Sequence, residues 1–314
     1  MAELKKVACE AIDGVASELN NISQELWKNP ELNYKEHHAH TILTDFLDNQ
    51  GFHVERKYKL DTAFRATFGD DSAGPHVAVL CEYDALPDIG HACGHNLIAE
   101  LGVAAGVGIK AAMETSGKPI GKKHMTTILR YYSFLTGIIT KGGVKANIIP
   151  EEAELQYSIR APNKAELNVL LEKMSDCFES AAKATGCKVE CKYSDVPYLN
   201  FIGNKELAST FETNAKELGL AFDEDGMCSE GIQASSDIGN VSYIVPSLHP
   251  VFHIGTDEVN HTRGYAEATG AAAAQPYTLR QGKAIAMTAV DVFINENLLQ
   301  RIKIEFENEP QRKD

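Results

Sequence analysis

DIGHACGHNLIAE, residues 88–100, places two histidines and one cysteine within five positions, directly after the apolar run HVAVLCEYD at 76–84. A nearly continuous apolar run of this length is typical of a strand that is buried on both faces. The small-residue segment that follows has helical character up to about Glu114. A strand, a loop and a helix in this order predict an α/β domain with a mostly parallel central sheet. Ligands of such sheets collect at the carboxyl ends of the strands, which is where this loop lies.

The rest of the chain predicts further helices and strands of the main domain and a separate small domain. Helical spacing of apolar residues predicts two helices in residues 3–50, and β-prone runs follow at 52–56 and 63–68. Between 124 and 195 we predict a small α+β lid domain with strands in 137–149, 153–161 and 187–193 and a helix at about 164–185. This predicts an inserted lid at 124–195 between two parts of one main domain, 1–123 and 196–314. The second part adds a helix from about Asn204, apolar runs at 241–245 and 251–255, and a long final helix from about Ala266.

Composition narrows the class of partner. The chain has 314 residues, 44% apolar residues, a formal net charge of -14 and an isoelectric point near 5.3. No basic stripe is present, so we expect no nucleic-acid partner, and no apolar run approaches the ~20 residues of a membrane span. Seven cysteines at irregular spacing and no secretory leader predict reduced thiols and a cytoplasmic location. A small-molecule substrate is therefore expected.

The loop after the expected central strand carries candidate metal ligands. Cys93 and His95 are two positions apart, so a thiolate and an imidazole can converge on one zinc ion or a similar metal. The alternative is a buried free cysteine beside a hydrogen-bonded histidine. His91 is the weaker candidate of the three. Asp84, at the end of the strand, is placed to hydrogen-bond a metal-bound imidazole, although it could also be a turn residue before Pro87.

A second group of histidines lies far downstream, in HPVFHIGTDEVNHT at 249–262. This segment contains His249, His253 and His261, and it could return to the same edge of the sheet. One of the three could then complete a metal site across the fold.

Several motifs together resemble peptidase family M20, the aminoacylase and amidohydrolase group of metallopeptidases, and within it the dipeptidase-like branch. The motifs are CEYDALP (81–87), HACGHN (91–96), GGVKANIIP (142–150), SIR (158–160), SSDIGN (235–240), FHIG (252–255) and NHT (260–262). They occur in order over nearly the whole chain. The resemblance implies a metal-dependent exopeptidase-like catalytic domain with an inserted lid that also forms a homodimer.

The same resemblance implies roles for individual residues. It gives the metal ligands as Cys93, His95 and His261. Asp84 then supports the metal site, while Asn147 and Arg160 hold the carboxylate of the substrate, to which an amide and a guanidinium fork are suited. Up to two zinc or manganese ions share a bridging water in this family, and a glutamate takes its proton during attack on the amide. The implied substrates are small dipeptides or N-acyl amino acids.

The chain departs from the family where the catalytic base is expected. The family carries a glutamate pair in a segment like TPAEE, at the end of the strand that follows the small-residue helix. Residues 118–139 read KPIGKKHMTTILRYYSFLTGII and contain no acidic residue, so a contiguous block is missing. Glu151 and Glu152 align instead with the turn of the lid, and His124 lacks any supporting motif. Glu100 could approach the ion from the helix, or could be an ordinary buried carboxylate.

Two readings of function remain at this stage. The first is a metal-dependent hydrolase of amide or peptide bonds in dipeptides or N-acyl amino acids. The second is a catalytically impaired shortened form or pseudoenzyme that pairs with another subunit through the lid, since the glutamate pair is absent.

Overall fold

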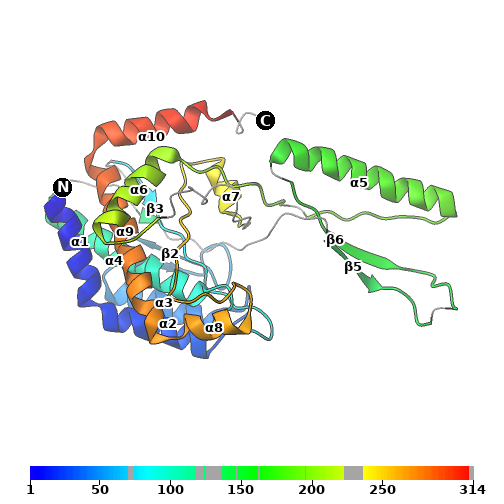
Figure 1. Ribbon diagram of the computed structural model, residues 1–314, viewed down its shortest axis with the longest axis horizontal. Helices are drawn as coiled ribbons and strands as arrows, with labels where there is room; N and C mark the ends of the chain where they lie inside the picture. Colours follow the sequence, from blue (N-terminus) through cyan, green and yellow to red (C-terminus); the bar gives the residue numbers. More distant parts are fainter. Residues whose placement is uncertain are drawn as a thin grey trace. The chain divides into compact units, whose positions relative to one another are not determined.

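The structure is a computed structural model that describes residues 1–69, 74–117, 123–124, 136–145, 147–161, 163–194, 196–222 and 236–310, with only the backbone at 123, 124 and 136. The chain forms two compact units, which are described separately below (Figure 1). Unit 1 comprises Met1–Leu129, Asn204–Gly226 and Leu248–Glu307, and unit 2 comprises Arg130–Gly203, Met227–Ser247 and Asn308–Asp314.

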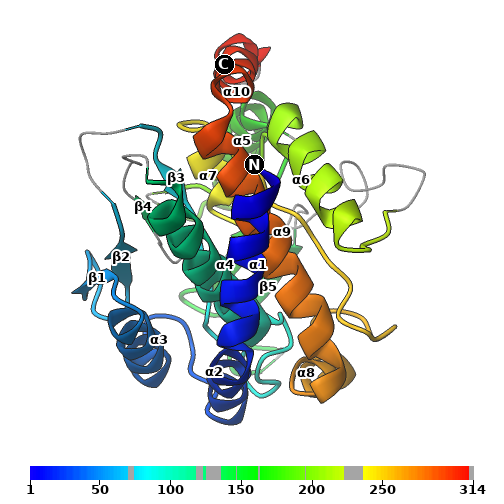
Figure 2. The same cartoon turned by 90° about the vertical axis from the view of Figure 1, so that its left-hand side faces the viewer.

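Long helices form the centre of unit 1. They are α1 (Ala2–Gly14), α2 (Ala16–Lys28), α4 (His95–Ser116) and α9 (Gln275–Ile294). Figure 2 shows α1, α4 and α9 running side by side. Helix α4 is buried on most of its sides because its neighbours enclose it, and most of its residues are small or apolar. Within the described residues it alone has the length and hydropathy of a membrane span, and 83% of that window is buried inside the protein. It is the core helix of this unit.

Helix α4 approaches α1 closely because glycine faces the contact. A Cβ atom added at Gly108 would lie 2.8 Å from the backbone oxygen of Ala8. This distance leaves no room for any side chain unless the helices separate. The small residues AAGVG (104–108) of α4 therefore serve helix packing, with Gly108 in contact with α1.

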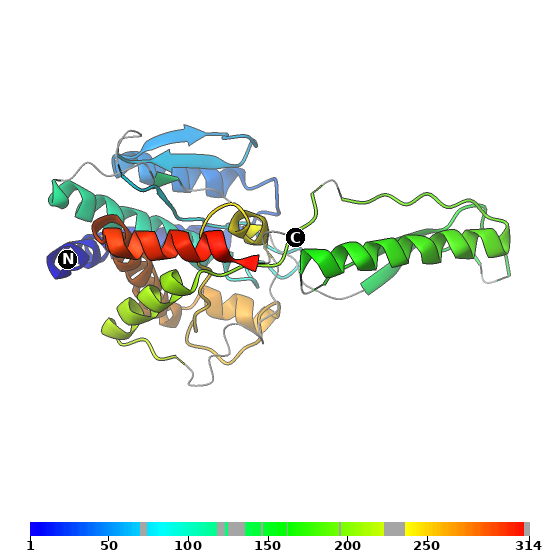
Figure 3. The ribbon, with the colours of Figure 1, turned by 90° about the horizontal axis from the view of Figure 1, so that it is seen from above.

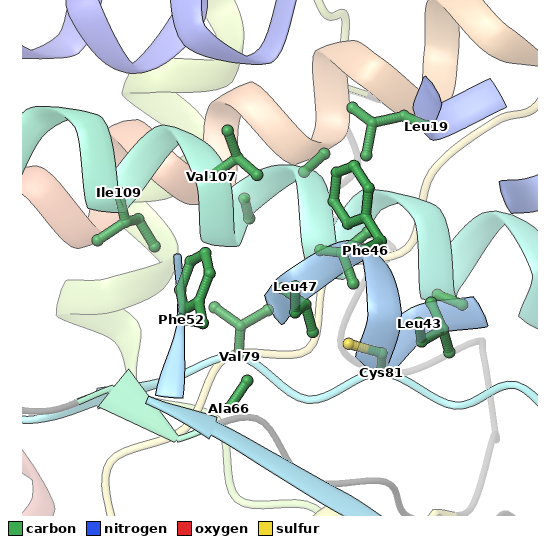
Figure 4. Packing of buried hydrophobic residues seen from close by; sticks show 14 of the residues in the cluster. Leu19, Leu43, Phe46, Leu47, Phe52, Ala66, Val79, Cys81, Val107 and Ile109 are labelled. Carbon is green, nitrogen blue, oxygen red and sulfur yellow. The ribbon is translucent and has the colours of Figure 1, made fainter. Parts of the chain in front are cut away.

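One further helix and a β-hairpin complete this side of the core. Helix α3 (His37–Asn49) packs beside β1 (His53–Arg56) and β2 (Phe64–Thr67), which pair in antiparallel register. Figure 4 shows Phe46 and Leu47 of α3 meeting the apolar face of α4. The sequence predicted two opening helices, whereas the structure has three, because α1 and α2 are separated by a single residue.

The expected central strand is much shorter than its apolar run. Strand β3 covers only Val77–Ala78 and pairs in parallel with β4 (Lys123–His124). Residues 81–85 are all buried, as predicted for a strand covered on both faces, but they join no strand ladder among the described residues. A ladder requires a neighbouring strand. The expectation that no strand follows the small-residue helix was wrong, because β4 follows α4, but among the described residues β4 pairs only with Val77 and Ala78.

The later parts of the chain return to unit 1. They are α6 (Lys205–Glu217), α8 (Arg263–Thr269), the short 3-10 helix η1 (Ala272–Ala274) and α10 (Glu296–Asn308). The prediction of one long final helix from Ala266 was wrong, since the chain forms four helical pieces there. Gly270 follows the last residue of helix α8. Pro276 lies in the first turn of α9, where a backbone amide has no carbonyl partner within the helix, so its missing amide hydrogen costs no hydrogen bond.

Unit 2 contains an antiparallel pair of strands and a long helix (Figures 1 and 3). The strands are β5 (Thr136–Lys141) and β6 (Glu154–Ser158), the helix is α5 (Lys164–Thr185), and a short α7 covers Ile238–Ser242. The ring of Tyr157 on β6 packs on Phe178 of α5 at 5.5 Å between centroids. Among the described residues, the strand predicted at 187–193 is absent and the run at 241–245 starts in a helix, because neither apolar run has a strand to pair with.

Candidate metal centre

His95 begins helix α4 and is almost fully buried, with 2% of its surface exposed. The preceding Gly94 has φ of 79°, a left-handed conformation that glycine adopts without strain and that turns the loop into the helix. The ring nitrogen Nδ1 of His95 lies 2.8 Å from Oδ1 of Asp84 and 3.0 Å from the Asp84 carbonyl oxygen. Asp84 therefore fixes the orientation of the imidazole, as the sequence predicted.

A second carboxylate reaches the opposite side of the same ring. Oε2 of Glu82 lies 3.1 Å from Nε2 of His95, and Glu82 is itself 8% exposed. Glu82 was missed as a site residue by the sequence analysis. The pattern that could have identified Glu82 is EYD in CEYDALP, because residues two positions apart on an extended chain point to the same side.

The electrostatics of His95 depend on these two carboxylates. Burial alone lowers the pKa of His95, but the hydrogen bonds and negative charges of Asp84 and Glu82 outweigh burial and raise the pKa to about 9. Nε2 of His95 is buried, and its contact among the described residues is the ion pair with Oε2 of Glu82 at 3.1 Å. An imidazole held at Nδ1 by a carboxylate is oriented as metal-binding histidines are.

The other two predicted ligands lie around the same loop. Cys93 is a reduced thiol with 8% exposure. His261 has an exposed side chain, and its backbone amide donates to the carbonyl oxygen of Ala92 at 2.9 Å. Its φ of 68° is unusual for a residue with a side chain. In the described part of the chain, no three His, Cys, Asp or Glu side chains converge closely enough to hold an ion. The ligand role of this set stays a prediction.

The side chains that could bind a metal can be compared with the ligands that zinc and manganese prefer. A thiol at Cys93 and the available Nε2 of His95 have the chemistry of a zinc site. Chemically these residues suit one divalent ion, although among the described residues no third donor lies close enough to complete the site. They do not fit two, because the carboxylates and the histidine that the family supplies for the second ion have no counterpart in this sequence.

His91 shapes the loop. Its Nε2 donates to the carbonyl oxygen of Leu26 at 3.0 Å. Burial, followed by the charge of His95, lowers the pKa of His91 to about 4, so the ring is neutral at pH 7. The sequence makes His91 the weaker ligand candidate of the three, and this hydrogen bond gives it a structural role.

Glu100 is fully buried one turn further along α4 than Asn96. Nε2 of Gln275 donates to its Oε2 at 2.9 Å, and Ser23 provides a second hydrogen bond. Burial raises the pKa of Glu100 to about 7, and these two hydrogen bonds only partly offset it. These partners come from α2 and α9, so they give Glu100 the surroundings of a buried structural carboxylate.

The other residues considered from the sequence lie in varied settings. In unit 1, Nδ1 of His253 accepts from the amide of Gly255 and its ring packs on Tyr277, while His249 is half-buried. The side chain of His124 lies outside the described residues. Glu151 and Glu152 are exposed in unit 2, where Glu152 pairs with Lys141, as expected for a solvated charge cluster.

The two residues predicted to bind the substrate carboxylate also lie in unit 2. Asn147 is exposed, and Arg160 is half-buried with its Nε donating to Oγ of Ser158 at 3.1 Å. Asn147 lies in the turn between β5 and β6, not in a strand as the sequence predicted, and Arg160 follows the end of β6. Their role in binding substrate stays a prediction.

Comparison with known proteins identifies the family. Residues 58–186 match the peptidase dimerisation domain of the M20 peptidases. The Xaa-Arg dipeptidase of Mus musculus is 39% identical, covering 96% of this chain and 92% of the mouse protein. The chain belongs to the M20 peptidase family. The human Xaa-Arg dipeptidase is 37% identical at the same coverage, and one of the subunits of p-aminobenzoyl-glutamate hydrolase from Escherichia coli is 21% identical over 97% of this M20 chain.

Solved structures agree on the fold of this M20 peptidase. A dinuclear metal binding M20 peptidase from Bacillus subtilis has a TM-score of 0.63 at 16% identity, covering 90% of this chain and all of the other. A tripeptidase from Staphylococcus aureus has a TM-score of 0.52 at 15% identity, covering 86% of this chain and 98% of the other. The α/β catalytic domain with an inserted lid is therefore confirmed.

The comparison also supports the internal deletion. The alignment with the mouse dipeptidase spans 396 positions, whereas 96% of this 314-residue M20 chain supplies only about 300 of them. Roughly a quarter of the aligned positions thus have no residue in this chain. Since an alignment begins and ends on paired residues, these unpaired positions are internal to it.

Proposed function

We propose that this chain is a metal-dependent hydrolase of amide or peptide bonds in dipeptides or N-acyl amino acids. The observation that carries the proposal is the arrangement of His95, held at Nδ1 by Asp84 beside the buried thiol of Cys93. The 39% identity to a dipeptidase over almost the entire chain supports the same reaction class.

Each site residue has a defined task in this proposal. Asp84 keeps the proton of His95 on Nδ1, so that Nε2 together with Cys93 and His261 can hold one zinc or manganese ion. When bound, the ion polarises the amide carbonyl and lowers the pKa of a bound water. Asn147 and Arg160 bind the terminal carboxylate of the substrate.

The substrate class follows from chemistry and from the relatives. The mouse and human relatives are both named Xaa-Arg dipeptidase, so we propose dipeptides that end in a basic residue. The formal charge of -14 favours cationic substrates over anionic ones through long-range attraction.

The assembly and location are also proposals. The match to a dimerisation domain at 58–186 supports a homodimer through the lid. In unit 2, exposed apolar side chains on and beside the β5 and β6 pair would be covered in a dimer, namely Ile138, Ile139, Val144, Ile148, Ile149 and Leu155. None of the described cysteines forms a disulfide, which supports the cytoplasm.

A second candidate function rests on the missing block. A hydrolase of this type without its general base loses on the order of 100-fold or more in rate. The chain could then serve as an inactive partner that pairs with a full-length subunit through the lid. This candidate is favoured by the absence of the glutamate pair and by the quarter of the positions aligned with the mouse relative at which this chain has no residue.

The deciding experiment is a hydrolysis assay with purified chain and added zinc or manganese, over dipeptides ending in Arg, Lys, Ala and Glu and over N-acyl amino acids. Cys93→Ala is the test variant, and Cys177→Ala, at an exposed position of α5, is the matched control. Turnover that survives in Cys177→Ala and disappears in Cys93→Ala supports the hydrolase. A folded, metal-loaded chain without turnover on any substrate would overturn it and support the inactive partner.

A further inference from the structure

The side chain next to the predicted ligand His95 is Asn96, which is fully buried in the first turn of α4. Its Nδ2 donates two hydrogen bonds, to Oγ of Ser23 at 3.1 Å and to the carbonyl oxygen of Thr269 at 2.9 Å. These partners are 73 and 173 positions away in the sequence. A single amide group therefore joins α2, α4 and the end of α8.

The segment 261–270 that Asn96 holds is the one that carries His261. At one end of it, the amide of His261 donates to the carbonyl of Ala92 at 2.9 Å. At the other end, Oγ1 of Thr269 donates to the carbonyl of His91 at 3.3 Å. Both ends of this segment are therefore attached to the loop that carries Cys93.

Helix α2 supports the same segment from outside the loop. Nε1 of Trp27 donates to the carbonyl of Ala266 at 2.7 Å, and Nε2 of Gln24 donates to the carbonyl of Gly270 at 3.0 Å. A Cβ atom at Gly270 would lie 2.2 Å from the Trp27 ring, so the indole lies directly on the chain. These contacts restrict how far the segment can slide.

A polar chain inside unit 1 orients the amide of Asn96. Ser23 accepts from Asn96, and Glu100 lies four positions after Asn96 on the same face of α4. Gln275 donates to Glu100 in turn. With the amide reversed, the side-chain oxygen of Asn96 would face the carbonyl oxygen of Thr269, and two acceptors repel each other.

We propose that Asn96 is a positioning residue, which sets the register of segment 261–270 and so places His261 relative to Cys93 and His95. This inference rests on the proposed metal site, because it assigns the geometry of that site to a residue that is not a ligand. Supporting hydrogen bonds of this kind control affinity, and their loss typically weakens metal binding by about 10–100-fold.

The variant that tests the proposal is Asn96→Asp, which keeps the shape of the side chain and removes both donated hydrogen bonds. The matched control is Asn204→Asp. Asn204 is equally buried in unit 1 and its Nδ2 donates to a backbone carbonyl, that of Ile302, but it joins α6 to α10. Both variants leave a carboxylate facing a carbonyl oxygen, so both are expected to lose stability.

Two measurements separate positioning from general destabilisation. In the metal-free protein, hydrogen exchange of peptides covering 261–270 should accelerate in Asn96→Asp and stay at the wild-type rate in Asn204→Asp. Zinc affinity, measured by competition with a chelator on folded protein, should fall by about 10-fold or more in Asn96→Asp and by less than about 2-fold in Asn204→Asp.

The outcomes distinguish this inference from the proposed function. Wild-type exchange and zinc affinity in a folded Asn96→Asp variant would overturn the positioning role, as would equal losses in both variants. If the wild-type chain binds no zinc, both the metal site and the positioning role fail. If zinc binds and Asn96→Asp weakens it, the positioning role stands even where no turnover is found.

Discussion

Glu100 gives unit 1 a dependence of stability on pH that can be calculated from its surroundings. The carboxyl group is fully buried, and burial raises its pKa from 4.5 to about 7 despite hydrogen bonds from Gln275 and Ser23. Between these two values the folded protein binds more protons than the unfolded chain does. The free energy of unfolding therefore falls as the pH rises through this window.

The size of the effect follows from the shift. A difference of one pKa unit corresponds to about 1.4 kcal/mol. The free energy of unfolding should therefore fall by about 3 kcal/mol over the whole pH range between the two pKa values, and by about 2 kcal/mol between pH 5 and pH 8. Glu100→Gln keeps the shape of the side chain and its acceptor for Gln275, but it cannot ionise. Relative to this variant, the wild-type protein should be about 2 kcal/mol less stable at pH 8 than at pH 5.

The assay is urea unfolding of metal-free protein, followed by circular dichroism at pH 5 and pH 8. Comparison of wild type with Glu100→Gln cancels the many other groups that titrate in a chain with this charge. The control is Glu114→Gln on the same helix, where the carboxylate is 53% exposed and pairs with Lys110. A wild-type minus Glu100→Gln difference that is equal at both pH values would refute the reasoning, because it would show that burial does not keep Glu100 protonated.

Other predictions concern packing, helix ends and the metal. Gly108→Ala should lower the free energy of unfolding by about 1–3 kcal/mol, because the added Cβ would lie 2.8 Å from a backbone oxygen of α1. The control is Gly14→Ala, which should not destabilise the protein because no atom lies within 4 Å of the added Cβ. Thermal unfolding of the two variants measures the difference. Asp84→Asn should weaken zinc binding by about 10–100-fold because His95 loses its carboxylate, and unchanged affinity by chelator competition would contradict this. Glu305→Gln should destabilise by about 0.5–2 kcal/mol, because its carboxylate accepts from the first two amides of α6, and chemical unfolding measures the loss.

The sequence places the candidate ligands in one short stretch, and the structure shows one contact within it, the hydrogen bond between Asp84 and His95. Asp84, Cys93 and His95 lie within twelve positions, and short spacings can be interpreted without knowing the fold. Glu82 was overlooked although it is only two positions from Asp84, because an acidic residue in a buried strand could not be distinguished from a turn residue. Asn96 had no local signal at all, since its partner Thr269 is 173 positions away.

The sheet was the part of the fold that the sequence could not predict. An apolar run shows that residues 79–85 are buried, which the structure confirms for most of them, but it does not show whether a neighbouring strand exists. The run at 241–245 illustrates the same limit, because its first two residues end helix α7 instead of joining a strand. Strand formation depends on distant partners, whereas α4 and α5 form from residues close in sequence.

The hydrogen bond between Asn96 and Thr269 has a consequence for how the protein is made. Ribosomes add about 5–20 residues per second, so the 173 residues between these two positions take roughly 10–30 s to synthesise. Throughout that interval the thiol of Cys93 and the imidazole of His95 have emerged without the segment that later attaches to their loop. The nascent chain must therefore remain reduced and unaggregated until its final sixth arrives, and the proposed metal site can form only after translation has passed Thr269.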